Sequence, residues 1–160
     1  MVKFLARALT RHHLWCYNDT VKPRVVIDTN VLFEGLTKKG GAAGLIVETW
    51  LAGLLQPCVS NALAYEYLDV FSRKLSPYRW QTLQPVLGTL LEMATFVPIH
   101  FTWRPISPDP ADDHVIDCAM NAGAAVVTYN IKDFRNAEIV LRLPVLRPVE
   151  FVHWLTEVQP

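Results

Sequence analysis

The sequence predicts a single α/β domain built on a parallel sheet of four to five strands. The chain has 160 residues and a hydrophobic share of 51%, which is enough for one well-packed core. Short β-branched runs such as residues 25–27 are typical of strands that are buried on both faces. These runs alternate with longer segments of helical pattern, and that alternation indicates parallel strands joined by right-handed crossovers.

The elements follow one another regularly from residue 24 onward. Strands are expected at residues 25–27, 56–59, 96–99, 125–128 and 144–146, and helices at 42–55, 60–73, from 76 onward, 109–123 and 148–155. Ser60 and Ser76 suit N-cap positions, and Pro77 suits the first turn of a helix. Pro85 is expected to kink or divide the helix that begins at Ser76. Gly123 is expected to end the helix before the fourth strand.

Two parts of the chain are distinguished by this pattern. Residues 1–22 are basic and weakly patterned, and we treat them as an N-terminal extension of uncertain structure. Residues 23–156 are expected to form the folded domain. No internal repeat divides this domain further.

Charge and cysteine content exclude few functions but indicate the cell compartment. The 15 basic and 15 acidic residues balance, which does not exclude nucleic-acid binding because a local basic face is enough. Cys16, Cys58 and Cys118 lack the spacing of metal ligands, and reduced thiols are expected in a cytosol. The N-terminus has no sustained apolar segment, and polar residues interrupt the uncharged stretch 49–65. We therefore expect a cytoplasmic protein that does not enter a membrane.

Four polar residues, each placed after a predicted strand, are the candidate site. They are Asp28, Glu66, Asp112 and Asn130. The carboxyl ends of parallel strands lie along one edge of an open α/β sheet, so these side chains are expected to meet in one cleft. A cluster of acidic oxygens there is suited to a hard divalent cation and to hydrolysis at phosphorus.

Asp28 and Glu66 each have a place in this cleft by pattern alone. Asp28 ends the strand at residues 25–27, although an N-cap of the following helix is an equally good interpretation. Asn30 could orient Asp28 or cap that helix itself. Glu66 lies about 60° outside the apolar stripe of its helix, at ~100° per residue, and so can face the end of the first strand.

Asp112 is the better metal candidate of two neighbouring acids. It points along the inward face of its helix, whereas Asp113 lies about 100° away and contributes at best from the flank. Asp109 and Pro110 leave an alternative open, in which Asp109 caps the helix and Asp112 serves its first turn. His114 is expected on the surface or supporting the site, not as a ligand.

The remaining site residues are predicted from their position. Asn130 offers an amide oxygen, so three carboxylates and one amide would suit one Mg²⁺ or Mn²⁺ ion. Asp133 and Phe134 are expected to form a turn. Residues expected to support the ligands are Asn30, Ser60, Thr128 and Asp113, and residues expected to contact phosphates are Lys38, Lys39 and Arg73. An ion pair with Asp69 on the same helix is the more ordinary role for Arg73.

The order of these motifs resembles that of the PIN-domain nucleases. The matching segments are VVIDTN at 25–30, Ser60 with Glu66, DPADDH at 109–114 and VVTYNIKDF at 126–134. They are most similar to the VapC-like toxins of bacterial toxin–antitoxin pairs. The resemblance implies a three-layer α/β/α fold, Mg²⁺- or Mn²⁺-dependent cleavage of RNA, a homodimer and a small antitoxin partner. It also implies that Asp28, Glu66, Asp112 and the position of Asn130 hold the metal.

Asn130 is a departure from the family pattern, because many PIN nucleases have aspartate there. One branch reads Asn-x-Lys-Asp-Phe at this point, as this chain does. Two other functions stay open. A phosphatase could use Asp28 as a nucleophile, although such enzymes would want a second acid where Asn30 stands. A catalytically weakened PIN-fold module could instead bind RNA or protein without cleaving it.

Overall fold

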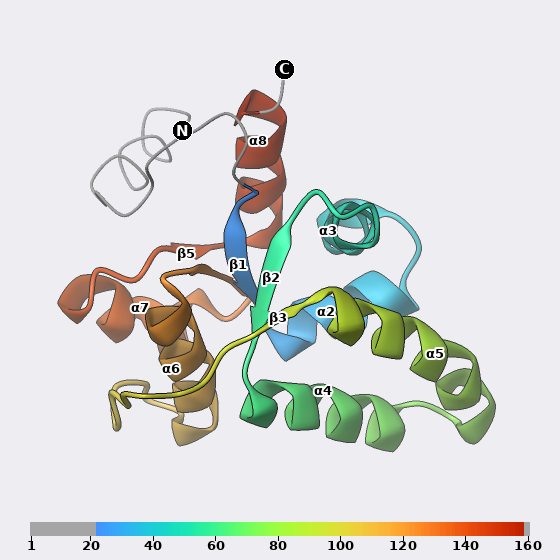
Figure 1. The fold of residues 1–160 in the computed structure, drawn as a ribbon, viewed down its shortest axis with the longest axis horizontal. Coiled ribbons are helices and arrows are strands. Elements are labelled where there is room, and N and C mark those ends of the chain that lie inside the picture. Colours follow the sequence, from blue (N-terminus) through green and yellow to red (C-terminus); the bar gives the residue numbers. More distant parts are fainter. Residues whose placement is uncertain (1–21, 159–160) are drawn as a thin grey trace.

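The computed structural model describes residues 22–158, and the extension predicted at 1–22 lies almost wholly outside them. The described residues form five strands, seven α-helices and one short 3₁₀ helix (Figure 1). In chain order these are β1 (Arg24–Ile27), α2 (Thr29–Thr37), α3 (Gly41–Leu51), β2 (Gln56–Val59), α4 (Asn61–Lys74), α5 (Pro77–Met93), β3 (Thr95–Phe96), η1 (Pro110–Asp112), α6 (Asp113–Ala122), β4 (Ala125–Val127), α7 (Ile131–Val140), β5 (Val145–Leu146) and α8 (Pro148–Val158).

The five strands form one parallel sheet in the order β3-β2-β1-β4-β5, which confirms the predicted fold class. The first strand lies at the centre, and Ile27 at its end is level with Val127 at the end of β4. The strand order reverses at β1, because β2 lies on one side of it and β4 on the other. In open α/β sheets, ligands bind beside the carboxyl ends of the strands at such a reversal.

Helices cover both faces of the sheet and complete the three layers. Figure 1 shows α6 and α7 on one side of the strands, and α2 and α3 on the other. The central strands are wholly apolar where they are buried, since Val25, Val26, Val126 and Val127 have no accessible surface. A strand buried on both faces needs such residues, which is why the β-branched runs identified these strands from the sequence.

Capping residues begin and end the helices as predicted. The Ser60 hydroxyl accepts a hydrogen bond from the Leu63 N–H, and the Ser76 hydroxyl accepts one from the Arg79 N–H. Gly123 ends α6 with a φ of 59°, a left-handed conformation that glycine adopts without a steric penalty.

The structure differs from the prediction at two helices. The expected division at Pro85 is wrong, because α5 continues through this residue as one helix. Pro85 lies on the exposed side, where water can satisfy the carbonyl that loses its N–H partner. The turn expected at Asp133 and Phe134 is also wrong. Both residues belong to the first half of α7, and Phe134 is fully buried.

Other expectations concern thiols and membranes. Cys58 and Cys118 are free and buried, as predicted for reduced core cysteines, whereas Cys16 lies outside the described residues. Within residues 22–158, no helix combines the length and the apolar character that crossing a membrane requires.

Candidate functional site

Asp28 lies at the carboxyl end of β1 and caps α2, so both interpretations of its position hold at once. Its Oδ1 accepts a hydrogen bond from the Thr29 N–H at 2.8 Å, and its Oδ2 accepts one from the Thr128 hydroxyl at 2.6 Å. The residue is 5% exposed. Burial raises the pKa of Asp28 despite these two hydrogen bonds, and the charge of Glu66 raises it further.

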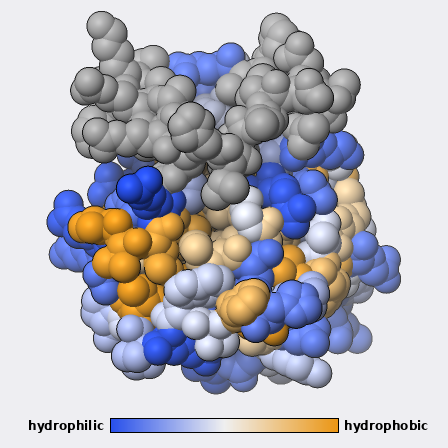
Figure 2. Space-filling view, turned by 60° about the vertical axis from the view of Figure 1, so that its left-hand side comes forward, coloured by the Kyte–Doolittle hydropathy of each residue, from blue (hydrophilic) through white to orange (hydrophobic). Residues whose placement is uncertain are grey.

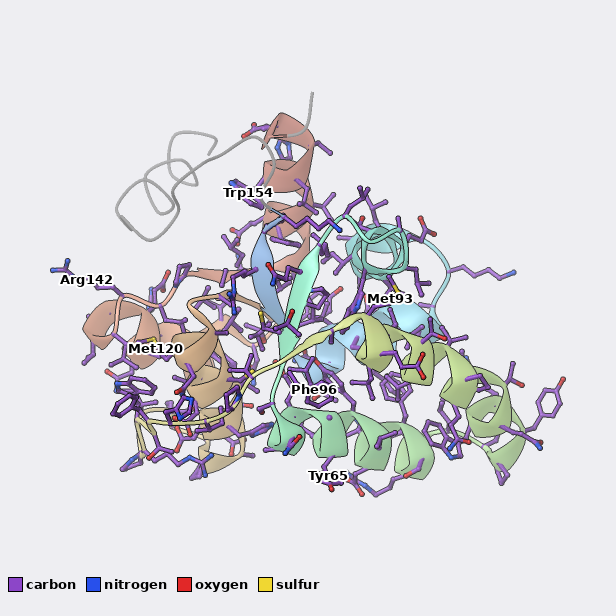
Figure 3. All side chains as sticks on the ribbon, in the orientation of Figure 1. Tyr65, Met93, Phe96, Met120, Arg142 and Trp154 are labelled. Carbon is purple, nitrogen blue, oxygen red and sulfur yellow. The ribbon has the colours of Figure 1, made fainter. Side chains whose placement is uncertain are left out.

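Glu66 reaches the same place from α4. The Tyr67 hydroxyl next to it donates a hydrogen bond to the carbonyl of Ile27, the last residue of β1, which ties this turn of α4 to the strand end. Figure 3 shows Tyr65 on the outer side of α4, away from the strands, whereas Glu66 is partly buried. Successive helical residues point about 100° apart, so burying Tyr67 leaves Glu66 at the flank predicted for it.

His114 forms an ion pair with Glu66, and this pair connects α6 with α4. The contact joins His114 Nε2 and Glu66 Oε2. Burial alone would raise the pKa of Glu66, but the hydrogen bonds of His114 and Thr29 prevail and lower it. Burial likewise acts to lower the pKa of His114, but its hydrogen bond to Glu66 outweighs burial and raises that pKa. The prediction that His114 supports the site therefore matches its contact with a candidate ligand.

Asp112 is the least satisfied acid of the site. Among the described residues, no hydrogen-bond partner meets its buried Oδ2 atom. Burial raises its pKa, and the charges of four other carboxylates raise it further, to about 7. Those carboxylates, in order of effect, belong to Asp28, Asp109, Asp133 and Glu66. A half-buried carboxyl with no protein donor and several acidic neighbours is a position where a cation would be stabilised.

Sequence reasoning missed Asp109 and Asp133 as contributors to this negative charge. The alternative in which Asp109 caps a helix holds for η1, because Asp109 accepts a hydrogen bond from the Ala111 N–H at 3.0 Å. Asp133 was assigned to a turn. Asp133 raises the pKa of Asp112 because it occupies the first turn of α7, the helix that follows β4. Recognising α7 in the sequence would have placed Asp133 at the same sheet edge.

Asn130 lies at this edge but is not joined to the three carboxylates by any hydrogen bond in residues 22–158. Its side-chain amide donates to Asp133, and its backbone N–H donates to the Thr128 hydroxyl at 2.9 Å. Tyr129 lies between Thr128 and Asn130 in the chain, and its hydroxyl donates a hydrogen bond to Glu34 at 2.9 Å. Thr128 therefore links Asp28 to the segment that presents Asn130.

Among the described residues, the other predicted supporting residues share no hydrogen bond with the three carboxylates. Asn30 is exposed in the first turn of α2, and the cap of that helix is Asp28 rather than Asn30. Ser60 is buried at the start of α4. Asp113 is also buried, but its Oδ1 accepts hydrogen bonds from the backbone N–H groups of Ile106 and Ser107. Asp113 therefore holds the loop that precedes the site.

The three basic residues predicted to contact phosphates are all exposed, and two of them already have acidic partners. Lys38 lies 3.0 Å from Glu34, and Arg73 lies 3.0 Å from Asp69, the ordinary role considered for it. Lys39 follows directly after Lys38, just beyond the end of α2.

The donor chemistry fits a hard divalent cation better than any other cofactor. Asp28, Glu66 and Asp112 offer carboxylate oxygens, which Mg²⁺ and Mn²⁺ prefer. In residues 22–158, no group of three His, Cys, Asp or Glu side chains is already arranged to hold a metal. Asp28 accepts hydrogen bonds from Thr128 and Thr29, and Glu66 is paired with His114, so both acids already have partners within the described chain.

Comparison with solved structures supports the fold. The chain is similar to the FitAcB crystal structure from Neisseria gonorrhoeae, with a TM-score of 0.60 and 17% identity over 78% of this chain and 98% of that one. It is similar to VapBC2 from Rickettsia felis bound to a promoter DNA fragment, with a TM-score of 0.56 and 13% identity over 78% and 98%. FitAB bound to the IR36 DNA fragment gives 0.54 and 16% over 78% and 94%.

Comparison with curated proteins finds no significant match. The PIN domain family, however, matches residues 24–132, which include β1 through β4 and all four residues of the predicted site. This match covers most of the chain and agrees with the motifs that carried the resemblance. The chain therefore belongs to the PIN domain family.

Proposed function

We propose that this protein is a divalent-metal-dependent endoribonuclease that hydrolyses RNA phosphodiester bonds with Asp28, Glu66 and Asp112. The observation that supports it best is the unpartnered buried oxygen of Asp112, whose pKa is raised to about 7 by burial and by neighbouring acids from four elements or their ends. Membership of the PIN domain family supports the same chemistry.

The residues divide the work by their contacts. Asp28 and Asp112 would bind a Mg²⁺ or Mn²⁺ ion, with the Asn130 amide oxygen as a further ligand. When bound, such an ion activates water and offsets the charge that develops on the phosphoryl oxygens. Thr128 and Thr29 fix both oxygens of Asp28, so its orientation is set before a ligand arrives.

Glu66 would orient the attacking water. Its lowered pKa keeps the carboxylate ionised near neutral pH, because His114 donates to Oε2 and outweighs the effect of burial. The predicted contacts of Lys38, Lys39 and Arg73 with phosphates remain part of the proposal.

The test is cleavage of a labelled single-stranded RNA by metal-stripped protein, with and without added Mn²⁺. We expect cleavage only with the ion, and a loss on the order of 100-fold or more in Asp28→Asn and in Asp112→Asn. Glu48→Gln is the matched control, because this exposed acid on α3 is not among the residues of the proposed site. A wild-type protein that cuts no RNA, or either site variant cutting at the wild-type rate, would contradict the proposal.

A second function is favoured by a specific observation. Asn130 stands where many PIN nucleases have aspartate, and no group of three metal ligands is preformed between residues 22 and 158. A module that binds RNA or protein without catalysis would need neither that aspartate nor such a group. Calorimetric titration with Mn²⁺ separates the two functions. Saturable binding that Asp112→Asn abolishes supports the nuclease, whereas the absence of binding to the wild-type protein supports the module.

We further propose that the protein is the cytoplasmic toxin of a toxin–antitoxin pair, forms a homodimer and binds a small antitoxin. The similarity to VapBC2 and FitAB supports a partner protein. Figure 2, which brings the side of α6 and α7 forward, shows hydrophobic patches among hydrophilic surface. Ile139 and Val140 at the end of α7 are 70% and 62% exposed. Light scattering that finds only monomers would contradict the homodimer.

A further inference from the structure

Tyr129 occupies a position that the proposed mechanism does not use. It stands between Thr128, whose hydroxyl donates to Asp28, and Asn130, the proposed amide ligand. The backbone on either side is fixed, because the Thr128 N–H donates to Leu146 and the Asn130 N–H donates to the Thr128 hydroxyl. The base of the tyrosine side chain is therefore anchored at the acidic edge of the sheet.

The far end of the Tyr129 side chain is anchored as well. Its hydroxyl donates to Oε1 of Glu34 at 2.9 Å, while Oε2 of Glu34 accepts from Lys38 at 3.0 Å. Glu34 lies in α2, the helix that Asp28 caps. The ring thus spans from the end of β4 to the second turn of α2, and a side chain held at both ends has little rotational freedom to lose on binding.

The held ring is nevertheless open to solvent. Tyr129 is 44% exposed, which leaves aromatic surface available beside the acids. Lys38 is exposed and contacts Glu34, the residue that accepts the Tyr129 hydrogen bond, and the exposed Lys39 follows it in the chain. An aromatic surface and positive charge therefore lie together. Sites that bind single-stranded nucleic acid combine these two features, since bases stack on rings while cations meet phosphates.

We propose that Tyr129 stacks against one unpaired base of the RNA next to the scissile phosphate, and that Glu34 is a positioning residue that holds the ring. This inference rests on the proposed function, because it identifies how the same site recognises single-stranded RNA. Stacking on an aromatic face tolerates any base, so Tyr129 selects unpaired RNA rather than a particular sequence.

Two other exposed aromatic side chains provide a comparison. Tyr65 is 72% exposed but points away from the strands on the outer side of α4 (Figure 3). Phe101 is 70% exposed, and its backbone is held by Asn121 near the far end of α6 from Asp112. Asn121 lies nine positions after Asp112, which is roughly 13 Å along the helix axis. Phe101→Ala is therefore a matched control that removes an exposed ring away from the acids.

The experiment measures RNA binding by fluorescence anisotropy in an Asp112→Asn background, which prevents cleavage during the titration. The probe is a labelled, unstructured 12-nucleotide RNA in Mn²⁺ buffer, together with versions that carry one abasic ribose at each position in turn. Binding constants are compared for the Asp112→Asn protein alone and for the same protein with Tyr129→Ala, Tyr129→Phe, Glu34→Ala or Phe101→Ala. Wild-type cleavage of the same RNA is recorded in parallel.

We expect Tyr129→Ala to weaken binding of the intact RNA by about 5- to 100-fold. At one position the abasic ribose should weaken binding to the parent protein by a similar factor but leave binding to Tyr129→Ala unchanged. Tyr129→Phe and Glu34→Ala should each reduce that position's effect without abolishing it, because both variants keep the ring but break the hydrogen bond that holds it. Phe101→Ala should change nothing.

Two results would overturn the inference, and they can be told apart. In the first, wild-type protein cuts the RNA, but every abasic position weakens binding to the Asp112→Asn protein and to its Tyr129→Ala variant by the same factor. Tyr129 then contacts no base, and the nuclease proposal survives. If no RNA is bound and none is cut, the inference fails together with the proposed function.

Discussion

The Thr128 hydroxyl donates a 2.6 Å hydrogen bond to Oδ2 of Asp28, although the two residues are 100 positions apart in the chain. They meet because β1 and β4 are neighbours, with Ile27 level with Val127. The Asp28 N–H also donates to the Val127 carbonyl at 2.9 Å, which extends the pairing one residue beyond the strands. A single hydroxyl thus fixes the central acid of the site and accepts the Asn130 N–H.

Replacing Thr128 tests this link. Thr128→Val removes the donor to a buried carboxylate and should lower the free energy of unfolding by about 1–3 kcal/mol. It should also lower RNA cleavage, because Asp28 loses the contact that sets its orientation. Thr128→Ser keeps the hydroxyl and is the control for both effects. Urea unfolding curves and cleavage rates measure them, and identical behaviour of the two variants would refute the role of the hydroxyl.

The raised pKa of Asp112 makes stability depend on pH. A carboxyl whose pKa rises from 3.8 in the unfolded chain to about 7 in the folded protein holds its proton more tightly when folded. The stability that this proton contributes is present at acidic pH and is lost as the pH rises from about 4 to 7. Asp112→Asn should therefore raise the melting temperature of metal-free protein at pH 8.

The same substitution should have a much smaller effect on stability at pH 4, where Asp112 is protonated in the folded protein and, with a pKa of 3.8, only about half ionised in the unfolded chain. Thermal melts in EDTA at both pH values measure the difference. Asp69→Asn, at an exposed ion pair, serves as the control and should show little change at either pH. An equal shift for Asp112→Asn at pH 4 and pH 8 would mean that charge repulsion at Asp112 is not its cause.

The ion pair of His114 with Glu66 also stabilises the protein more at low pH than at high pH. Although burial opposes it, the Glu66 carboxylate raises the pKa of His114 above its ordinary 6.5. A raised histidine pKa contributes stability that is fully present below pH 6.5 and is lost as the pH rises through the folded-state value. We expect His114→Gln to destabilise the metal-free protein more at pH 6 than at pH 9. Unfolding curves at the two pH values test this, and a larger loss at pH 9 would contradict it.

Much of the site could be predicted because it depends on strand ends. The run at residues 25–27 marked a buried strand, and a parallel sheet directs the residue after each strand to one edge. Asp28 and Thr128 follow from that rule alone. Placing Glu66 also required the helical phase of its segment. The phase could not reveal that the neighbouring Tyr67 anchors this turn of α4 by donating a hydrogen bond to the Ile27 carbonyl.

The parts that could not be predicted depend on contacts between distant segments. Nothing in local pattern connects His114 on α6 with Glu66 on α4, because the pair exists only once both helices pack beside the sheet. Asp133 was missed for a different reason. The pair Asp133-Phe134 suits a turn by composition, whereas the burial of Phe134 and Ala137 against the domain determines that α7 forms.

One face of α6 holds the loop at residues 97–109 by hydrogen bonds to its backbone. Asp113 accepts from Ile106 and Ser107, as described above, and Asn121 accepts from His100 and Phe101. Between them, Asp117 accepts from the Trp103 N–H at 2.8 Å and from the Arg104 guanidinium at 2.7 Å. Asp117 is 1% exposed, so these donors satisfy a carboxylate that water hardly reaches.

Because Asp117 is buried while its partners are backbone and guanidinium groups, its removal should be costly. Asp117→Ala leaves the Trp103 N–H and Arg104 without their acceptor, and we expect a loss of about 1–3 kcal/mol in the free energy of unfolding. Asp69→Ala removes an acid from an exposed helical pair and should cost at most about 0.5 kcal/mol. Urea unfolding of both variants, with hydrogen exchange of the Trp103 amide, makes the comparison. Equal losses, or unchanged exchange at Trp103 in Asp117→Ala, would show that α6 does not hold this loop. Another contact would then have to position Asp109, at the end of the loop, near Asp112.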